Sequence, residues 1–374
     1  MNSFSRKAES LTAKKDFAYY WARFGTLIIF FMLMVVIAII APKGSNFLSP
    51  ANLINIVYQS TDKILIGLGV FFAILIAGID LSIGSVMALC GIWMGLMMKA
   101  GMPVWSAILI GAVLGGALLG AINGSLVNLT GVHPFIITLG TQWIFRGIIM
   151  VISGARSVSG FPESFKEVVN YRVGGQIPMA IFIAIGVAAI LWFIAAHTKM
   201  GRNIYAFGGN KEAAWYSGIN IKLHTLIVFM ISGICAGLAG LIITAKTGAA
   251  EPLAGSGYET FAIAAAVIGG TSFFGGKGNV WSVVVGGLII GLINNGLNMM
   301  RVDSFYQQVV MGILIIAAVT LDTLLPVSYT HLMMKSLSIR ISNGAWQKRT
   351  HIITARSAVS RYPFPENSGT GRLG

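Results

Sequence analysis

Residues 223–245 read LHTLIVFMISGICAGLAGLIITA, a run of 23 residues without a single Asp, Glu, Lys or Arg. A helix needs about 20 apolar residues to cross the hydrocarbon core of a bilayer. This run therefore predicts a membrane-spanning helix. Comparable apolar stretches recur along the chain, at residues 25–41, 53–77, 81–98, 104–129, 135–152, 178–196, 260–271, 280–299 and 307–325.

These stretches predict an all-α integral membrane protein with about ten transmembrane helices. Residues 260–271 are too few to cross a bilayer alone, so we expect a broken or re-entrant segment there. Such a segment is tolerated only where protein or a water-filled cavity covers its backbone. Gly116, Gly120 and Asn123 recur as Gly287, Gly291 and Asn294, 171 residues later. This spacing predicts an inverted repeat, a common transporter architecture; coincidence in a glycine-rich chain is the alternative.

The composition excludes an ordinary soluble enzyme. Of 374 residues, 56% are hydrophobic and only 10% are charged, whereas a soluble domain carries about a quarter of charged residues. The mean hydropathy is +0.80. A net charge of +14 could indicate a nucleic-acid partner, but the apolar body favours a membrane protein with basic loops and no nucleic acid.

The last part of the chain differs from the rest. Residues 326–374 carry seven Lys or Arg and one Glu, a net +6, and contain no apolar span. Their first residues, PVSYTHL at 326–332, resemble translated sequencing-adapter text. We interpret this basic tail as a frameshift or sequence artefact, with a genuine basic cytoplasmic extension as the alternative. Residues 25–325 form the predicted transmembrane domain.

Basic residues give the predicted orientation. Residues 1–24 contain five Lys or Arg, which places this N-terminal segment in the cytoplasm. Counting spans from there puts the loop 197–222, with four Lys or Arg against one Glu, on the same side. The loop 153–177 then lies outside, with Arg156, Lys166 and Arg172 as its basic residues.

Polar residues inside the apolar body are candidates for function, because ionisable groups in hydrocarbon are costly. Asp80 lies within AGIDLSIGS at 77–85. It either accepts backbone N–H bonds at the start of the next helix or contacts a permeating solute. Amide and hydroxyl groups suit a hydrophilic pathway, although bonds between helices are the alternative. The predicted pathway residues are Asp80, Ser82, Asn123, Asn294, Asn295 and Asn298.

We find no catalytic constellation and no metal-ligand spacing in the sequence. Residues 271–278, TSFFGGKG, lack the first glycine of a phosphate-binding loop and the Ser or Thr that follows its lysine. We therefore expect no cofactor in this chain. Cys90 and Cys235 both stand in apolar runs and are expected to be buried.

Several motifs in order resemble bacterial sugar importer permeases of the ATP-binding-cassette (ABC) type, the ribose/xylose/allose group. They are IDLSIGS at 79–85, GRNIYAFGGNKEAA at 201–214 with SGI at 217–219, GYE at 257–259, IGGTS at 268–272 and NNGLN at 294–298. The resemblance extends over about residues 25–324. Within that family, AAEPLAG at 249–255 and FFGGKG at 273–278 are most similar to D-allose permeases.

The resemblance implies a transport subunit rather than an enzyme, located in the bacterial inner (plasma) membrane. It implies import of a monosaccharide, D-allose, ribose or a similar sugar, by alternating access. The partners would be an ATPase that binds ATP and Mg²⁺, a periplasmic or extracellular sugar-binding protein, and a second permease copy. An ion-coupled secondary transporter is the alternative.

The same resemblance assigns the loop 197–222 to contact with the ATPase. Its short helical segment 210–217 is expected to act as a coupling helix; an ordinary amphipathic interfacial helix is the alternative. Arg156, Lys166 and Arg172 are candidates for docking the binding protein, with solvated loop charges as the alternative. The coupling residues are Gly208, Gly209, Asn210, Ala213, Ala214, Ser217 and Gly218.

Overall fold

The computed structural model describes residues 24–42, 46–303, 305–313, 315–317 and 320. The chain divides into two units, Met1–Asp322 and Thr323–Gly374. The second unit lies wholly outside the described residues, and the basic tail 326–374 with it. Residues 1–23 of the predicted N-terminal segment are also outside.

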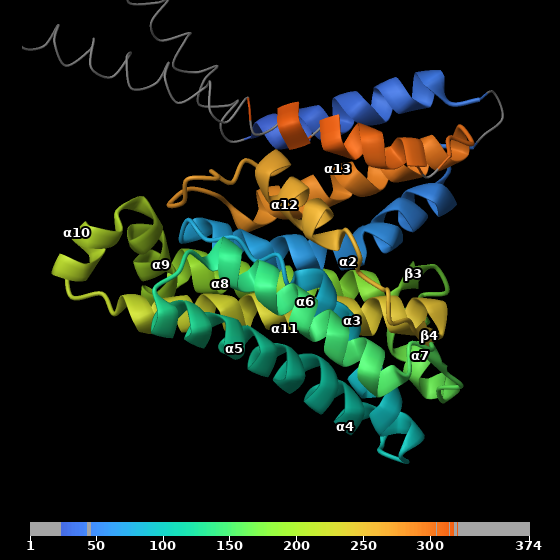
Figure 1. The fold of residues 1–374 in the computed structure, drawn as a ribbon. Coiled ribbons are helices and arrows are strands. Elements are labelled where there is room, and N and C mark those ends of the chain that lie inside the picture. Colours follow the sequence, from blue (N-terminus) through green and yellow to red (C-terminus); the bar gives the residue numbers. More distant parts are fainter. Residues whose placement is uncertain (1–23, 43–45, 304, 314, 318–319, 321–374) are drawn as a thin grey trace, which may run out of the picture. The chain divides into compact units, whose positions relative to one another are not determined.

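Helices dominate the described chain (Figure 1). A helix over Phe24–Ile40 comes first and one over Phe305–Ala317 comes last. Between them lie α2 (Pro50–Leu75), α3 (Ile83–Lys99), α4 (Val104–Ile108), the π-helix η1 (Leu109–Leu114), α5 (Gly115–Thr130), α6 (Pro134–Ser153), α7 (Glu163–Asn170), α8 (Met179–His197), α9 (Lys199–Gly209), α10 (Lys211–Tyr216), α11 (Ile221–Thr247), α12 (Tyr258–Ile268) and α13 (Val280–Met299).

Six helices among the described residues are long and apolar enough to cross a membrane, which confirms a mostly helical membrane protein. They are α2, the continuous α4–η1–α5, α6, α8, α11 and α13. Four further apolar helices are shorter: Phe24–Ile40, α3, α12 and Phe305–Ala317. The count of about ten crossings and the inverted repeat therefore stay predictions.

Local sequence explains where the long helices begin and end. Ser49 caps α2 by accepting the Asn52 N–H at 3.3 Å, and Pro50 follows as the first helical residue. Glycines end two of the other long helices. Gly131 follows the last residue of α5 with φ +67°, and Gly248 follows the last residue of α11 with φ +70°. This left-handed conformation stops a helix and favours glycine.

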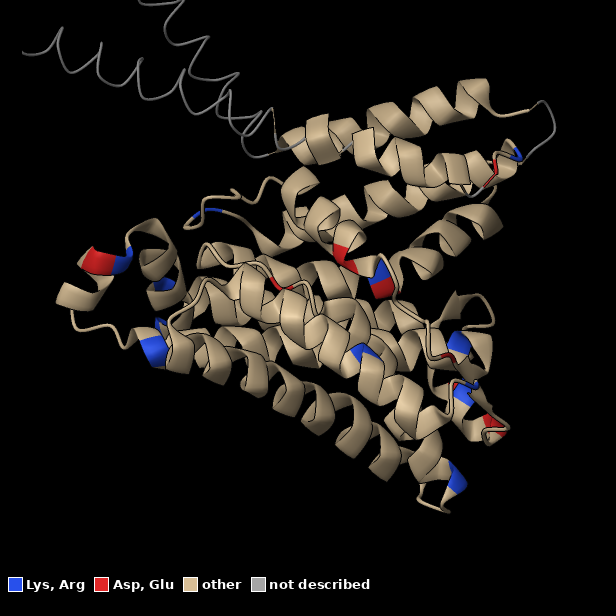
Figure 2. Cartoon of the chain, viewed as in Figure 1, with Lys and Arg blue, Asp and Glu red and all other residues tan. Residues whose placement is uncertain are grey.

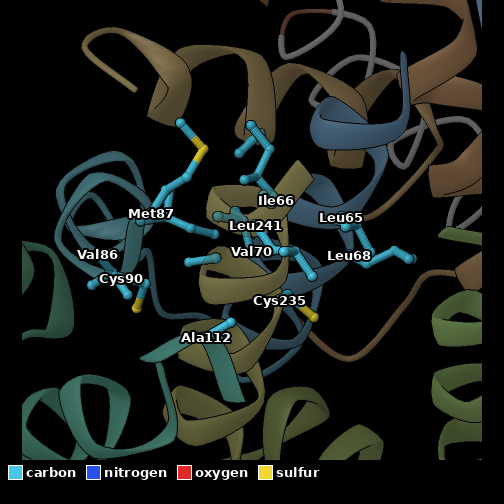
Figure 3. Packing of buried hydrophobic residues seen from close by; sticks show 14 of the residues in the cluster. Leu65, Ile66, Leu68, Val70, Val86, Met87, Cys90, Ala112, Cys235 and Leu241 are labelled. Atoms are coloured by element: carbon cyan, nitrogen blue, oxygen red, sulfur yellow. The ribbon is translucent and has the colours of Figure 1, made fainter. Parts of the chain in front are cut away.

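The core lies around α2 and α11, which pack against each other and against α3, α5, α12 and α13. Figure 3 shows the buried side chains that α2, α3, η1 and α11 contribute, among them Leu65, Met87, Ala112 and Leu241. Cys90 and Cys235 are buried there, as expected. Helices in lipid gain little free energy from excluding water. Van der Waals contact between small residues, which lets the helices approach closely, therefore stabilises their association.

The contact between α5 and α11 shows this close packing most clearly. A Cβ atom on Gly116 would collide with the carbonyl oxygen of Gly233, and one on Gly233 would collide with that of Gly116. Gly120 meets the Phe229 carbonyl in the same way. The glycine-rich composition of this chain therefore sets the distance between these two helices.

Two helices are interrupted in ways that matter for the site. Between α2 and α3, residues 76–82 leave the helical path, and Ala77 takes φ +56°. The short helix expected at residues 260–271 is α12, which has 11 residues and follows an irregular segment from Glu251 to Gly257. Backbone polar groups are thus freed from helical bonding at two places inside the apolar body.

Short strands tie the connecting loops together. β1 (Val158–Ser159) pairs antiparallel with β4 (Ala249–Ala250), with Val158 opposite Ala250. β2 (Arg172–Val173) pairs with β3 (Ile177–Pro178). Figure 2 shows that charged residues gather near the ends of the helices and are few along them. This distribution fits a helical body immersed in lipid.

Candidate functional site

Asp80 lies at the break between α2 and α3 and is only 1% exposed. Its Oδ1 accepts the Ser82 backbone N–H at 3.0 Å and the Ser82 hydroxyl at 2.6 Å. Its Oδ2 accepts the Ser232 hydroxyl of α11 at 2.7 Å. Both carboxylate oxygens are therefore bonded, and one donor is a backbone N–H just before α3, as in the first of the two alternatives that the sequence left open.

The network extends to α5 through Asn123, whose Nδ2 donates to the Ser82 hydroxyl at 2.7 Å. The Oδ1 of Asn123 is buried and has no hydrogen-bond partner among the described residues. We call Asp80, Ser82, Asn123 and Ser232 the Asp80 network. It brings together three of the predicted pathway residues and adds Ser232, a buried polar residue of α11.

A second polar contact fixes the same break from α6. The Thr138 hydroxyl donates to the Ile79 carbonyl at 2.9 Å and accepts the Leu81 N–H at 3.1 Å. Two of the backbone groups that the break takes out of the helices, the Ile79 carbonyl and the Leu81 N–H, are thereby bonded. The break is consequently held from α5, α6 and α11 at once.

The predicted asparagines of α13 lie elsewhere. Asn295 and Asn52 of α2 exchange two side-chain hydrogen bonds, at 3.1 and 3.0 Å. Asn298 accepts a bond from Gln307 at 2.8 Å, and Asn294 is half-buried. Asn295 therefore joins two helices, and the structure does not bring the α13 residues into the Asp80 network.

A buried ion cluster on α2 and α11 was not anticipated as a unit. The carboxylate of Asp62 lies 3.0 Å from the Lys246 ammonium and 3.3 Å from that of Lys63. Lys246 also donates to the Tyr58 carbonyl and to the Thr61 hydroxyl. Lys246 is 184 residues away from Asp62, and no spacing in the sequence links the two.

This cluster is connected to the loop after α6. The Tyr58 hydroxyl donates to Asn170 Oδ1 at 2.5 Å, at the end of α7. Asn170 Nδ2 in turn donates to the Ala245 carbonyl of α11 at 3.1 Å. The helix α7 is therefore fixed to α2 and α11 by side-chain bonds as well as by its buried Phe165 and Val169.

Arg146 of α6 binds the backbone of a neighbouring segment. Its Nη1 donates to the carbonyls of Pro252 at 2.5 Å and Ala254 at 2.9 Å. These carbonyls belong to the irregular segment before α12. Arg146 therefore holds the backbone of that segment in place.

The short helix predicted within residues 210–217 is confirmed as α10. Asn210 caps it by accepting the Ala213 N–H at 2.8 Å, and the Ser217 hydroxyl donates to the Ala213 carbonyl. Two large aromatic side chains project from α10, Trp215 at 62% and Tyr216 at 81% exposure. Neither aromatic residue was among the predicted coupling residues. Of those, Ala214 is buried and Gly208 is half-buried, whereas Gly209, Asn210, Ala213, Ser217 and Gly218 are exposed.

The preceding helix α9 packs tightly against the end of α2. A Cβ atom on Gly208 would collide with the Leu75 carbonyl oxygen, the same oxygen that accepts the Gly276 N–H at 2.9 Å. The Tyr205 hydroxyl of α9 donates to the Gly278 carbonyl at 2.9 Å. Thus α9 joins the end of α2 to the loop between α12 and α13.

A cavity of about 1330 Å³ lies beside α10. It is bounded by α9, α10 and the turn between α5 and α6, which includes His133. Lys211 and Lys222 line it together with Glu212. The surface around α10 is therefore concave beside two projecting aromatic rings, and its two lysines outnumber its one glutamate.

The three basic residues of the loop 153–177 belong neither to the Asp80 network nor to the surface around α10. Lys166 pairs with Glu163 within α7 at 3.0 Å, and Arg172 donates to the Gln176 carbonyl at 3.2 Å. Arg156 and Arg172 are exposed. The contacts that Lys166 and Arg172 make are local and leave their side chains at the surface.

An apolar helical body with buried polar junctions and a structured helical loop defines a helical membrane protein. Residues 52–319 match the family described as the permease component of the branched-chain amino acid transport system. The chain belongs to this permease family.

Three relatives carry names that refer to sugars. The chain is 55% identical to the D-allose transport system permease protein of Escherichia coli K12 over 326 residues, 86% of this chain and 99% of that protein. It is 42% identical over 300 residues to the ribose import permease protein of Haemophilus influenzae, covering 79% and 92% of the two chains. It is 37% identical over 329 residues to the galactose/methyl galactoside import permease protein of E. coli K12, covering 83% and 97%.

No solved structure matches the chain. The relatives confirm the resemblance drawn from the motifs: the protein is a permease of the sugar ABC importer type and not an enzyme.

Proposed function

We propose that this permease imports D-allose, driven by a separate ATPase that carries the ATP and Mg²⁺. The observation that carries the sugar assignment is the identity of 55% to a D-allose permease along nearly its whole length. Ribose and similar monosaccharides are the alternatives. The relatives give the ion-coupled alternative no support, because they belong to a family of permease components.

The coupling mechanism follows from α9 and α10. In our proposal the N-terminus and α10 face the cytoplasm, and the ATPase binds α10 through Trp215 and Tyr216. Because Gly208 of α9 touches the end of α2 and Tyr205 is bonded to the loop before α13, a push on α10 would move both together. Two permease copies would then alternate between outward and inward openings around the sugar. The residues that shape this contact are Gly208, Gly209, Asn210, Ala213, Ala214, Ser217 and Gly218.

At the opposite end, we assign Arg156, Lys166 and Arg172 to docking of a periplasmic binding protein. Their place at the surface supports contact with carboxylates of a partner. The helix α7 that carries Lys166 is bonded through Asn170 to Tyr58 of α2. The outer loop and the coupling loop would thus act on two ends of one helix.

The direct pathway role predicted for Asp80, Ser82 and Asn123 stays a prediction. Their polar atoms face one another, which supports a role in positioning α3, α5 and α11 beside the sugar. Asn295 is bonded to Asn52, which supports a joint between α13 and α2. Asn294 and Asn298 are the members of the predicted set that are not buried.

The first experiment is uptake of labelled D-allose, D-ribose and D-galactose by cells that express the chain with and without the partner ATPase. We expect D-allose to accumulate fastest, and only when the ATPase is present. Undiminished accumulation without the ATPase would contradict an ATP-driven importer. Faster uptake of another sugar would reassign the substrate.

The coupling contact is tested by changing Trp215 and Tyr216 together to Ala, since both side chains project from α10. Ala214 and Gly218 are poorer choices, because Ala214 is buried and Gly218 has φ +80°. We expect less ATPase to co-purify with the double variant while membrane insertion is normal. The matched control is Trp105→Ala at the start of α4, where the exposed ring should be irrelevant to the ATPase.

A further inference from the structure

The helix α2 has an unusual exposed residue. Between positions 52 and 75 every residue of α2 is buried or half-buried except Gln59, which is exposed. Gln59 is nine residues after the start of α2, about 14 Å along the axis at 1.5 Å per residue, well inside the apolar part of the chain. An amide at that depth loses hydrogen bonds if it faces lipid.

Gln59 belongs to a polar stripe on one face of α2. Its Nε2 donates to Asn55 Oδ1 at 3.2 Å, and the Lys63 ammonium donates to its backbone carbonyl at 3.2 Å. Residues spaced by four lie above one another on a helix, so the three side chains form a continuous line. Asn55 and Lys63 are half-buried.

The stripe continues onto α12 and α6. The Lys63 ammonium lies 5.6 Å from the centre of the Tyr258 ring, within the range of a cation–π contact. The neighbouring Glu259 accepts a bond from Gln142 of α6 at 3.4 Å. Its other oxygen, Oε2, is buried and has no hydrogen-bond partner among the described residues. We call this set the polar belt; its members are Asn55, Gln59, Lys63, Tyr258, Glu259 and Gln142.

The faces of other helices show what a lipid-facing surface of this protein contains. Along η1 and α5 the exposed side chains include Leu109, Leu114 and Leu118. Along α8 they include Phe182 and Ile185. These faces are apolar, whereas the polar belt combines amides, charges and an aromatic ring. The belt also includes the first residue of α12, a broken helix, and broken helices flank substrate sites in many transporters.

We propose that the polar belt lines the path of a neutral, hydroxyl-rich monosaccharide. Amide groups accept and donate hydrogen bonds, which matches the mixed donors and acceptors of sugar hydroxyls. The half-buried Tyr258 ring offers an apolar surface to the sugar ring. This assignment rests on the proposed sugar transport, and it shifts the contact with sugar from the buried Asp80 network to a face that is open in the single chain.

The two native cysteines make a direct test practical, because Cys90 and Cys235 are 0% and 1% exposed and should not react. Gln59→Cys is expressed in the full chain, and a charged, water-soluble methanethiosulfonate reagent is applied to membrane vesicles. The matched control is Leu118→Cys, at a position that is 57% exposed on the apolar face of α5. We expect Cys at position 59 to react about tenfold faster, because the reactive thiolate forms in water and not in lipid.

D-allose added before the reagent should slow the reaction at position 59, and labelling should block D-allose uptake. Equal, slow reaction at both positions would overturn the proposal, since position 59 would then lie in lipid or in a dry contact between permease copies. Rapid labelling that leaves uptake intact would overturn it as well. Uptake by the unmodified chain in the same vesicles reports on the proposed function separately, and labelling by water-borne reagent does not depend on which sugar is carried.

Discussion

The Asp80 network and the polar belt are two polar regions within the same apolar body, and they differ in what their polar atoms face. The Asp80 carboxylate is bonded on both oxygens by Ser82 and Ser232, and it is almost completely buried. Gln59 of the polar belt is exposed, whereas the belt's Glu259 Oε2 is buried and has no partner among the described residues. In the first region both oxygens of the Asp80 carboxylate are bonded within the chain, and one buried oxygen, Asn123 Oδ1, has no partner among the described residues. The second region differs in that its amide Gln59 is exposed and can contact another molecule.

This difference separates two roles that look identical in a sequence. A polar residue in an apolar helix is costly wherever it lies, so its presence indicates selection for some purpose. Bonds within the chain point to holding helices together. Exposure with unused hydrogen-bonding groups points to contact with solute. The comparison therefore predicts that the first region controls stability and the second controls transport.

The largest expected effect comes from opening the buried ion cluster, whose Asp62 carboxylate is bonded within the chain like that of Asp80. Asp62→Ala leaves the ammonium of Lys246 buried without its carboxylate partner. We expect the free energy of unfolding to fall by about 3–5 kcal/mol, as for other buried pairs that lose one partner. Denaturant unfolding of the purified protein in detergent measures it.

The control for that variant is Glu163→Ala, which removes the pair with Lys166 at the surface of α7. An exposed pair contributes less than about 1 kcal/mol, so this variant should unfold almost like the parent. If both variants lowered the free energy of unfolding by a similar small amount, the Asp62 cluster would not have the stabilising role proposed for it.

An effect of comparable size is expected for Asp80→Ala. The hydroxyls of Ser82 and Ser232 would lose their acceptor in a buried place. Each buried group left unpaired costs about 1–3 kcal/mol. The thermal unfolding midpoint of Asp80→Ala should lie well below that of Asp80→Asn, which retains an acceptor oxygen; equal midpoints would mean that the carboxylate bonds are unimportant.

A single hydrogen bond of the same network is removed by Ser232→Ala. This change deletes the donor to Asp80 Oδ2 without adding volume to the contact. We expect a loss of about 1–3 kcal/mol, because one oxygen of a buried carboxylate is left without a donor. The same denaturant titration checks it, and a loss larger than that of Asp80→Ala would reverse the expected order of the two variants.

The smallest effect on stability is expected at Gln59, the exposed member of the polar belt. Gln59→Leu removes an exposed amide whose side-chain bond is to Asn55 on the same helix. Exposed substitutions of this kind usually change stability by less than about 0.5 kcal/mol. An unfolding midpoint equal to that of the parent is therefore predicted, and a pronounced fall would place Gln59 among the structural residues.

The sequence predicted the helical body well, because long apolar runs admit few other structures in a membrane. Its expectation of a short helix at 260–271 corresponds to α12, and the helix within 210–217 corresponds to α10. The first rests on an apolar run too short to cross a bilayer, and the second on the short helical propensity of residues 210–217.

Contacts between distant residues were beyond its reach. Asp80, Ser82 and Asn123 were each singled out as polar residues in apolar surroundings, yet nothing in their spacing showed that they bond to one another. Lys246 meets Asp62 across 184 residues, and Ser232 meets Asp80 across 152. Gln59 went unnoticed because its significance lies in exposure, which depends on the helices around α2.

The separation between structural and transport residues is tested most directly by comparing Ser232→Ala with Gln59→Leu in one experiment. Both the unfolding midpoint and the initial rate of D-allose uptake per folded permease are measured, in vesicles that contain the ATPase and the binding protein. We predict a crossed result: Ser232→Ala lowers the midpoint and keeps most of the uptake, whereas Gln59→Leu keeps the midpoint and loses most of the uptake. Uptake that survives Gln59→Leu but is lost per folded copy of Ser232→Ala would contradict this separation.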